Sequence, residues 1–448
     1  MLGIHKNISK DAFHISDILF KNGYQSYLVG GSIRDILMNR NDLHDYDIAT
    51  DATPDDLKKI FKNAIAFGEK FGTILVIYNG FNFEITTFRT ESDYKDQRHP
   101  EKVTFIKDIK EDLKRRDFTM NAIAFDMRSN TLIDIFNGQQ DIKNKIIKCV
   151  GDPDLRFNED PLRLIRAVRF YVQLDFDIDK STYESIKKNA SDIGSVSKER
   201  IRDEFMRMIS FDKPSRGIEL LKDIGLLDYI FPEINLCLGV EQNKFHSLDV
   251  YHHLLLSMDM ADKRIRLAAL LHDIGKPQTK EGEHFFGHER VGAEMAEKML
   301  RRMKFPKKDI SLVSKLIYLH LFNYEEKWTD SAIRRFLRRV ENDETLELLF
   351  LLREADEHGN PISKYDFANL DELKNRISKI RDKDGYLSLK DLKLNGDDLI
   401  KIGYSSGMDI GKELQGLLIK VIEDPDINNK QELLKMAKND LIKFKNYA

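Results

Sequence analysis

The chain has 448 residues, of which 41% are hydrophobic and 33% charged, and its mean hydropathy is −0.45. This length exceeds one compact core and indicates about three domains. The 72 basic and 75 acidic residues give a net charge of −3, which excludes a uniformly basic nucleic-acid coat but not local basic patches. Two cysteines, Cys149 and Cys237, exclude a disulfide framework and a cysteine zinc site.

The first part of the chain alternates between helical and β patterns. Periodicity predicts helices over residues 11–22, from 33 and over 54–61, and strands over residues 25–29, 72–78, 81–88, 103–105 and 122–125. Asn79-Gly80 marks a hairpin between two of these strands. Residues 91–100 are polar and aperiodic, so we expect a mobile loop there. The sequence thus predicts a mixed sheet flanked by helices up to about Gly138.

From Gly151 onward the pattern is almost entirely helical. Helices are predicted over residues 161–172, 183–189, 198–209 and 214–221 and on to the C-terminus, with breaks at 359–361 and 382–385. The fold class is therefore an α/β head followed by an all-α remainder. No apolar run is long enough for a membrane span or a leader, so we expect a cytoplasmic protein that binds no membrane.

A glycine turn and a pair of acids carry the first chemical signal. Gly30-Gly31 joins a predicted strand to a predicted helix, where backbone N–H groups can approach a phosphate, although a plain turn is the alternative. Asp45 and Asp47 lie two apart on a strand, so both carboxylates face one side, as a Mg²⁺ site requires. Glu84 is the nearest third carboxylate, with an outward-facing strand acid as the alternative reading.

Five motifs in order resemble one family. Residues 30–35 (GGSIRD), with Asp45 and Asp47, resemble the head of the class II tRNA nucleotidyltransferases, the CCA-adding enzymes of the DNA polymerase beta superfamily. Later segments are similar to that family's ribose-selecting motif, hinge, base-reading motif and supporting helix, namely residues 115–122, 134–138, 159–163 and 199–204. The resemblance implies a DNA polymerase beta-like head (1–139), a helical neck (140–215), a helical body with an HD domain (216–360) and a helical tail (361–448).

The resemblance also implies residue roles in the head. Asp45, Asp47 and Glu84 would be catalytic, with Mg²⁺ on the first two. The implied nucleotide-binding residues are Gly30, Gly31, Ser32, Arg34, Arg116, Asp117, Asn121, Asp160, Arg163 and Arg166. Among these, Arg116 would bind the triphosphate and Asp117 would accept a ribose hydroxyl proton.

Asp160 and Arg163 are expected to read the base from one face of a helix. Asp160 can only accept a hydrogen bond and Arg163 can only donate, which suits the amino group and ring nitrogen of cytosine and adenine. Uracil and guanine would present a carbonyl to Asp160 and be repelled. A surface salt bridge between the two residues is the alternative. Arg166 and Arg169 continue this basic face, for phosphate or tRNA contact or for packing against acids such as Glu159.

Two segments bear on the scope of the activity. Residues 93–100 (DYKDQRHP) stand where the family has the flexible loop that switches from CTP to ATP, with His99 where arginine is expected. This favours addition of C, C and A over the two cytidines alone. Residues 67–73 (FGEKFGT) lack the basic element that bacterial poly(A) polymerases carry there, which favours a tRNA enzyme.

Eight of the twelve histidines lie between His246 and His358. Their pattern resembles the HD phosphohydrolase superfamily, with expected metal ligands His253, His272, Asp273, Asp356, His288 and His320. His252 is the alternative to His253. Such ligands suit Mn²⁺, Ni²⁺, iron or Mg²⁺, and the site could instead persist as an inactive scaffold.

A basic stripe is the last candidate. Residues 301–339 hold eleven Lys and Arg against four Asp and Glu, a local charge of +7. Arg334, Arg335, Arg338 and Arg339 recur at helical spacing and are candidates for tRNA phosphates, with a solvated helix face as the alternative. Glycines 396, 403, 407 and 411 could present N–H groups to tRNA or end helices.

These patterns predict an enzyme that adds C, C and A to tRNA 3′ ends from CTP and ATP, with no obligate protein partner. One alternative is an enzyme that adds only the terminal A, or a poly(A) polymerase. The other is an HD phosphohydrolase whose head only binds nucleotide.

Overall fold

The computed structural model describes residues 4–40, 45–65, 72–94, 100–243, 246–322, 324–325, 327–364, 366–384, 388–405 and 407–447. The chain forms two compact units. The first comprises Met1–Leu236 with Leu300–Phe305, and the second comprises Cys237–Met299 with Pro306–Ala448. The finer division into four domains, with boundaries after residues 139, 215 and 360, stays a prediction.

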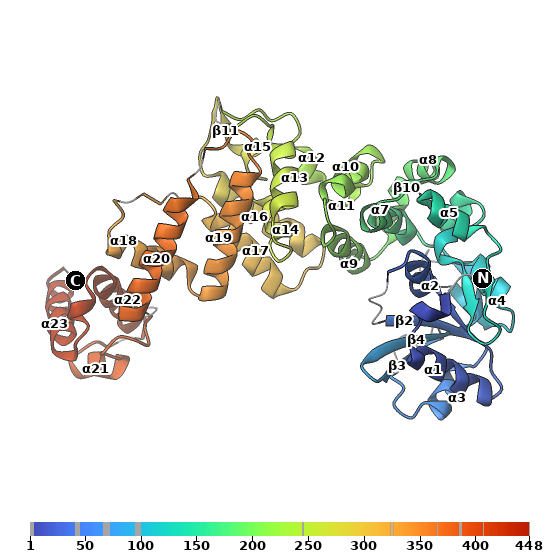
Figure 1. Cartoon of the computed structure of the whole chain (residues 1–448). Helices are drawn as coiled ribbons and strands as arrows, with labels where there is room; N and C mark the ends of the chain where they lie inside the picture. Colours follow the sequence, from blue (N-terminus) through green and yellow to red (C-terminus); the bar gives the residue numbers. More distant parts are fainter. Residues whose placement is uncertain are drawn as a thin grey trace. The chain divides into compact units, whose positions relative to one another are not determined.

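A six-stranded mixed sheet organises the first unit (Figure 1). Its strands, in spatial order, are β3 (Thr73–Tyr78), β4 (Phe81–Thr87), β2 (Asp45–Thr50), β1 (Ser26–Val29), β7 (Ala124–Asp126) and β8 (Thr131–Ile133). Only β2 and β4 are parallel neighbours in this sheet; its other pairs are antiparallel. The predicted mixed sheet is confirmed, and the hairpin at Asn79-Gly80 joins β3 to β4, with both residues at positive φ.

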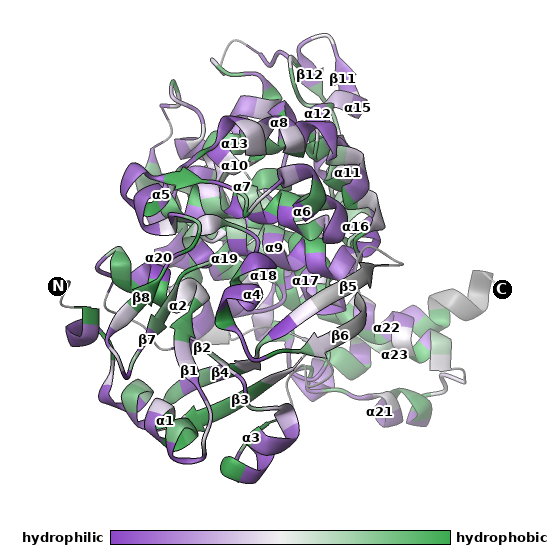
Figure 2. Ribbon diagram, turned by 90° about the vertical axis from the view of Figure 1, so that its right-hand side faces the viewer, coloured by the Kyte–Doolittle hydropathy of each residue, from purple (hydrophilic) through white to green (hydrophobic). Residues whose placement is uncertain are grey.

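Helices α1 (Lys10–Lys21), α2 (Gly30–Leu37) and α3 (Pro54–Ile60) pack against this sheet. Side-chain caps from Ser9 and Thr53 begin α1 and α3. Helix α2 begins at Gly30, three residues earlier than the pattern indicated. Figure 2 shows β3 as largely hydrophobic, in keeping with a strand that is covered by helix α3.

The expectation of a mobile loop over residues 91–100 is wrong at its ends. Strands β5 (Arg89–Tyr94) and β6 (Pro100–Phe105) form an antiparallel ribbon whose pairing runs from Arg89↔Phe105 to Tyr94↔Pro100. Main-chain hydrogen bonds hold such a ribbon without apolar alternation, so the polar sequence gave no β signal. Residues 95–99, the centre of the expected CTP-to-ATP loop, lie outside the described residues.

The remainder of the first unit is mostly helical, as predicted. Its other elements are η1 (Ile4–Asn7), α4 (Ile109–Lys114), η3 (Thr119–Asn121), α5 (Gly138–Asn144), β9 (Ile146–Ile147), α6 (Pro153–Glu159), α7 (Leu162–Leu174), β10 (Asp177–Ile178), α8 (Lys180–Lys188), η4 (Ala190–Ser195), α9 (Lys198–Ile209), α10 (Ser215–Asp223), α11 (Leu227–Ile230) and α12 (Pro232–Asn235).

Within its described residues, the second unit is helical apart from one short hairpin. Its elements are α13 (Val250–Met260), α14 (Arg266–Leu271), α15 (Lys276–Thr279), β11 (Lys280–Glu281), β12 (His284–Phe285), α16 (His288–Arg302), α17 (Lys307–Leu319), α18 (Asp330–Val340), α19 (Asp343–His358), α20 (Phe367–Asp384), α21 (Gly396–Lys401), α22 (Gly407–Glu423), η5 (Pro425–Ile427) and α23 (Lys430–Tyr447). Helix α16 ends in residues grouped with the first unit.

Two breaks between helices were predicted in this unit. The break at residues 359–361 is confirmed, because α19 ends at His358. The break predicted from residue 382 is too early, because α20 continues through Asp384. Gly403, at φ +108, follows the end of α21 and donates its N–H to the Ile400 carbonyl, which is a helix stop.

Candidate nucleotide site and candidate metal centre

A pocket of about 580 Å³ lies in the first unit. Its wall includes nine arginines, namely Arg34, Arg89, Arg115, Arg116, Arg163, Arg166, Arg169, Arg200 and Arg207. Four carboxylates, Asp47, Glu84, Asp117 and Asp160, line the same space. This excess of guanidinium groups suits a ligand with several negative charges, such as a polyphosphate.

The glycine turn brings the first helix against the acidic strand. Gly30 has φ +63, and a Cβ there would lie 3.0 Å from Asp47 Oδ2 and 3.2 Å from Arg116 Nη1. Gly31 donates its N–H to Asp47 Oδ2 over 3.1 Å, and Ser32 Oγ accepts the Asp47 N–H over 2.7 Å. The turn therefore fixes the orientation of the Asp47 carboxylate, and only glycine fits at position 30.

Three acids lie on the two parallel strands beside this turn. Asp45 and Asp47 are on β2, and the register places Glu84 of β4 opposite Asp47. Asp45 and Glu84 are both exposed, and Asp45 accepts a hydrogen bond from Asn82 Nδ2 over 2.8 Å. Asp47 and Glu84 line the pocket, and the role of Glu84 as a third catalytic carboxylate stays a prediction.

Burial and mutual repulsion disfavour the charged forms of Asp47 and Glu84. Burial raises the pKa of Asp47, although Arg116 and the Gly31 N–H act against it. Burial, together with the charges of Asp47 and Asp45, also raises the pKa of Glu84. A divalent cation between these carboxylates would supply the missing positive charge, so the donor set fits Mg²⁺.

Arg34, Arg116 and Asn121 connect the turn to the segment after α4. Arg34 Nη1 donates to Asn121 Oδ1 over 2.8 Å, and Arg34 also forms an ion pair with Asp35. Arg116 Nη2 donates to buried Asp112 over 3.2 Å. These contacts hold the two guanidinium groups at the pocket wall in fixed orientations.

Buried Asp117 and partly buried Arg166 form an ion pair in the pocket. Arg166 Nη2 and Nε lie 2.5 and 3.0 Å from Asp117 Oδ2, while Asn121 Nδ2 and the Phe118 N–H donate to Oδ1. Burial acts to raise the pKa of Asp117, but Arg166 and these hydrogen bonds lower it well below its ordinary value. Asp117 is therefore an ionised acceptor, as a ribose hydroxyl partner must be.

Arg169 packs against an acid, one of the two readings left open for it. Its Nε lies 2.7 Å from Glu204 Oε2, and both side chains are buried. Burial, followed by the charge of Arg166, lowers the pKa of Arg169 to about 10. Glu204 also lies 3.5 Å from Arg166 Nη1, so α9 supports two of the three arginines of α7, Arg166 and Arg169.

The prediction that Asp160 and Arg163 share one helix is wrong. Asp160 is the C-cap residue of α6, with φ −145, and Pro161 is the N-cap residue of α7, so a break separates the two helices; proline favours an extended residue before it. Both side chains still line the pocket. Among the described residues no ion pair joins them, since Arg163 pairs with Glu159 over 2.7 Å and Asp160 pairs with Arg200.

Sequence reasoning missed several residues of this pocket. Arg200 and Arg207 lie on α9 and line the pocket, and Glu204 supports it from between them. Their spacing of four and three residues puts all three on one face of a helix, a signal that was available in the sequence. Arg89 also lines the pocket, and nothing in its neighbourhood marks it beforehand.

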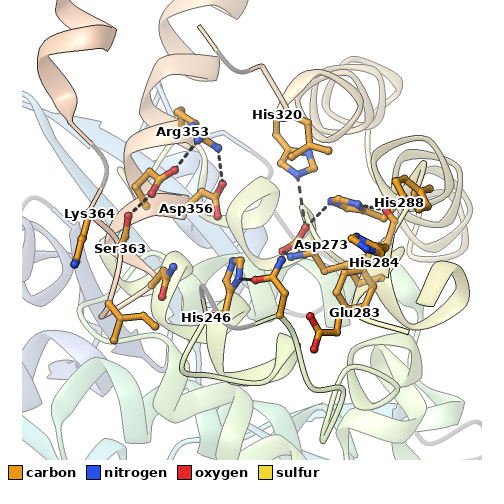
Figure 3. A pocket seen from close by; sticks show the side chains of 18 residues that line it. His246, Asp273, Glu283, His284, His288, His320, Arg353, Asp356, Ser363 and Lys364 are labelled. Atoms are coloured by element: carbon orange, nitrogen blue, oxygen red, sulfur yellow. Dashed lines mark hydrogen bonds and ion pairs between the residues drawn. The ribbon is translucent and has the colours of Figure 1, made fainter. Parts of the chain in front are cut away.

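A second pocket, of about 840 Å³, lies in the second unit (Figure 3). Six side chains in and beside its wall form two groups with the geometry of a metal site, and four of them, Asp273, His288, His320 and Asp356, line the pocket. One group is His253, His272 and Asp356, and the other is Asp273, His288 and His320. They come from α13, α16 and α19 and from the ends of α14 and α17.

Asp273 belongs to the second group, and its carboxylate also faces the first group. Its Oδ2 is 3.5 Å from His253 Nε2 and 3.4 Å from His272 Nε2. Its Oδ1 is 3.1 Å from His288 Nε2 and 3.6 Å from His320 Nε2, as Figure 3 shows. One carboxylate thus faces each group with a different oxygen.

The backbone sets the orientation of all four imidazoles. Each Nδ1 lies within hydrogen-bond distance of a main-chain carbonyl, namely His253 with Gly359 (3.1 Å), His272 with Ala269 (2.8 Å), His288 with Phe285 (2.7 Å) and His320 with Ile317 (2.6 Å). A neutral imidazole whose Nδ1–H is donated carries its lone pair on Nε2. In their neutral forms the four imidazoles therefore direct their Nε2 lone pairs toward the centre.

The centre also holds buried polar atoms that fit a cation. Asp273 Oδ1, Asp273 Oδ2 and His288 Nε2 are buried and have no hydrogen bond of regular geometry among the described residues. Lys276 Nζ lies 2.5 Å from Asp273 Oδ2, and this charge, against the effect of burial, holds the pKa of Asp273 well below its usual range. Deprotonated carboxylate and neutral imidazole are the forms that bind metals.

Two further histidines, His252 and His246, lie outside the cluster of six. His252 is exposed and bonds to Asp249, so His253 is the member of the pair in the cluster. His246 lines the pocket beside His253, and sequence reasoning did not single it out. Burial and the charge of Lys276 lower the pKa of His246 to about 4.

The basic stripe lies on α18 and is partly engaged. Arg338 Nη2 donates to Gln415 over 2.6 Å, and Arg335 lies 3.5 Å from Glu423. Arg339 lies over the Tyr318 ring. These contacts fasten α18 to neighbouring helices, so tRNA contact by the stripe, including Arg334, stays a prediction.

Comparison with known proteins identifies three domains in order. Residues 26–148 match the poly A polymerase head domain, residues 175–238 a probable RNA- and SrmB-binding site of polymerase A, and residues 245–360 the HD domain. The predicted DNA polymerase beta-like head followed by helical regions with an HD domain is confirmed. No helix within the described part of the chain is both long and apolar enough to cross a membrane.

Curated relatives are CCA-adding enzymes. That of Geobacillus sp. (strain WCH70) is 47% identical over 219 residues, which cover 49% of this chain and 54% of the relative. That of Staphylococcus aureus (strain MRSA252) is 48% identical over 227 residues, 50% of this chain and 56% of the relative. The chain therefore spans about half the length of the curated relatives it matches.

Solved structures extend the likeness to the whole fold. The CCA-adding enzyme of Bacillus stearothermophilus, crystallised in complex with CTP, superposes with a TM-score of 0.69 at 28% identity over 100% of both chains. The Thermotoga maritima CCA-adding enzyme complexed with tRNA has a TM-score of 0.55 at 20% identity, over 98% of this chain and 97% of the other. At that identity the second likeness concerns the fold alone.

Proposed function

We propose that this chain adds C, C and A to tRNA 3′ ends. It is a nucleotidyltransferase with a poly A polymerase head domain and an HD domain, and it is similar to CCA-adding enzymes. CTP and ATP are the nucleotide substrates and tRNA is the acceptor. The observation that carries the proposal is one pocket that combines carboxylates suited to Mg²⁺, nine arginines and a base-reading pair.

The reaction joins the tRNA 3′ hydroxyl to the α-phosphate of the nucleotide and releases pyrophosphate. Asp45, Asp47 and Glu84 would hold Mg²⁺, which when bound lowers the pKa of the attacking hydroxyl and neutralises charge on the phosphates. Arg34 and Arg116 bind the triphosphate beside the glycine turn, because their guanidinium groups are fixed at the pocket wall. Asp117 would accept a hydrogen bond from a ribose hydroxyl in exchange for one of the four that it already accepts, from Arg166 Nε and Nη2, Asn121 Nδ2 and the Phe118 N–H.

Asp160 and Arg163 select the base. Their acceptor and donor match the amino group and ring nitrogen of both cytosine and adenine, so protein groups replace a nucleic-acid template. Arg163 is held in place by Glu159 and by the Arg115 carbonyl. The amino group that cytosine and adenine share is thus the feature recognised.

The test uses a tRNA that ends before the first C, with CTP alone and with CTP plus ATP. We expect two cytidines with CTP alone and complete CCA with both nucleotides. Failure to incorporate cytidine would refute the proposal in favour of an enzyme that adds only A, and long A tracts would indicate a poly(A) polymerase. Asp47→Ala should abolish addition, while Asp55→Ala, at an exposed residue of α3, should leave it unchanged.

A second activity, metal-dependent hydrolysis of phosphoesters, is favoured by the histidine centre. Four converging Nε2 lone pairs and the two-sided Asp273 carboxylate suit two divalent cations of the Mn²⁺, Ni²⁺ or iron type, with Mg²⁺ as the harder alternative. We expect about two metal ions per chain, lost in Asp273→Ala. Hydrolysis of p-nitrophenyl phosphate should fail in Asp273→Ala and persist in Asp47→Ala; bound metal without hydrolysis would indicate a scaffold.

The basic stripe would contact tRNA phosphates. Arg334 and Arg339 replaced together by Gln should weaken tRNA binding and reduce its dependence on salt, with nucleotide binding unchanged. Equal salt dependence in the variant and the wild type would contradict this role. A cytoplasmic location, with no obligate protein partner, suits these substrates.

A further inference from the structure

We propose that Arg200 is the positioning residue that makes Asp160 selective for the amino group of cytosine and adenine. It acts by holding the Asp160 carboxylate in one orientation and by occupying most of its acceptor capacity. This inference rests on the proposed nucleotide addition and adds to it a residue that determines specificity.

Arg200 lies on the face of α9 that borders the pocket. Its Nη1 is 3.3 Å from Asp160 Oδ1 and its Nη2 is 2.9 Å from Asp160 Oδ2, a two-pronged contact. Both side chains are partly exposed to the pocket, at 29% and 22%. A planar guanidinium that contacts both oxygens prevents rotation of the carboxylate, which a single contact does not.

Most hydrogen-bond acceptor positions of the Asp160 carboxylate are already used within the protein. A carboxylate has about four acceptor positions. Asp160 Oδ1 already accepts from Arg200 and from the Leu162 N–H, and Oδ2 accepts from Arg200. Within the described part of the chain, Asp160 thus retains one acceptor position, on Oδ2.

Arg163 is limited in the same way. Of its five N–H donors, three are used, toward the Arg156 carbonyl, Glu159 and the Arg115 carbonyl. Two donors remain for the pocket among the described contacts. One acceptor beside a donor matches an exocyclic amino group beside a ring nitrogen, which cytosine and adenine both present.

Without the two-pronged contact from Arg200 (the fork), the Asp160 carboxylate could rotate. Uracil carries an N–H at the ring position where cytosine carries an acceptor nitrogen, so a carboxylate free to turn toward the ring could accept that N–H. The uracil carbonyl would then meet Arg163 rather than Asp160. Arg200 therefore excludes uracil by denying Asp160 this second orientation.

The test compares CTP with UTP. Arg200→Gln removes the charge and the fork, and Arg200→Lys keeps the charge but offers one contact point. The matched control is Arg128→Gln, an exposed arginine of the first unit that does not line the pocket. Each variant is assayed for kcat/KM with both nucleotides on the same tRNA, and for binding of CTP and UTP without tRNA by calorimetry.

We expect the CTP-to-UTP ratio of kcat/KM to fall roughly 10- to 100-fold in Arg200→Gln. A smaller fall is expected in Arg200→Lys and none in Arg128→Gln. An unchanged ratio, or equal losses for both nucleotides, would overturn the inference, because a purely structural role lowers both alike. Should the wild type add no cytidine, the proposed function fails, and the CTP-to-UTP binding ratio alone still decides the role of Arg200.

Discussion

Substitution of Gly30 by Ala tests whether the glycine turn orients the candidate metal carboxylate. The change has two costs that can be separated. The first is conformational, because Gly30 has φ +63, and an L-residue in that region loses about 1–2 kcal/mol. The second is steric, because the new Cβ would lie 3.0 Å from Asp47 Oδ2 and 3.2 Å from Arg116 Nη1, so that both must shift by a few tenths of an ångström.

The second cost should appear in activity rather than in stability. Movement of Asp47 stretches its 3.1 Å hydrogen bond from the Gly31 N–H and disturbs the site where phosphate and metal meet. Since misplacement by about 1 Å costs about 100-fold in rate, we expect roughly a 10- to 100-fold loss of cytidine addition.

Gly23→Ala is the matched control. Gly23 has φ +89 and no atom within 4 Å of its added Cβ, so it carries only the conformational cost. Urea unfolding should give losses of about 1–2 kcal/mol for both variants, and cytidine addition should fall only in Gly30→Ala. Equal activity in the two variants would refute the steric reasoning, and a metal titration that recovers Gly30→Ala would locate the defect at Asp47.

Three further predictions concern other parts of the chain. Gly275→Ala should reduce metal binding at the histidine centre and leave nucleotide addition unchanged, because the new Cβ would lie 2.3 Å from the carbonyl oxygen of the expected ligand His288. Metal analysis of the purified variant checks this. The depressed pKa of Asp117 stabilises the fold above the ordinary carboxyl pKa of about 4 and is lost as pH falls toward the lower folded value, so urea unfolding of Asp117→Asn should show a weaker loss of stability between pH 6 and pH 3 than the wild type. Burial raises the pKa of Cys149 and Cys237 to about 12, so a thiol reagent at pH 8 should label neither until the chain is unfolded.

Local patterns predicted most of the elements, the glycine turn and the paired acids, whereas the expected nucleotide-binding residues and histidine ligands came from the family resemblances. Helix α9 (Lys198–Ile209) coincides with its predicted range, because its apolar residues repeat at helical spacing. Asp45 and Asp47 do share a strand, since strand alternation is a property of a few consecutive residues. Apart from residues 103–105, the ribbon β5–β6 was not predicted, because it depends on pairing between two segments rather than on either one.

The sequence alone determined which residue types stand at which spacing: the glycine turn, the paired acids, the arginines and the histidines. Only the tertiary structure decided how these groups use their hydrogen bonds. Arg200 could have contacted solvent, a phosphate or a carboxylate, and the packing of α9 against α7 brings it to Asp160. Likewise, the carbonyl partners of the four histidines come from the folded backbone, and they decide which nitrogen of each ring can face a metal. A side chain's chemistry is local, but its partners are set by segments that meet only when the chain folds.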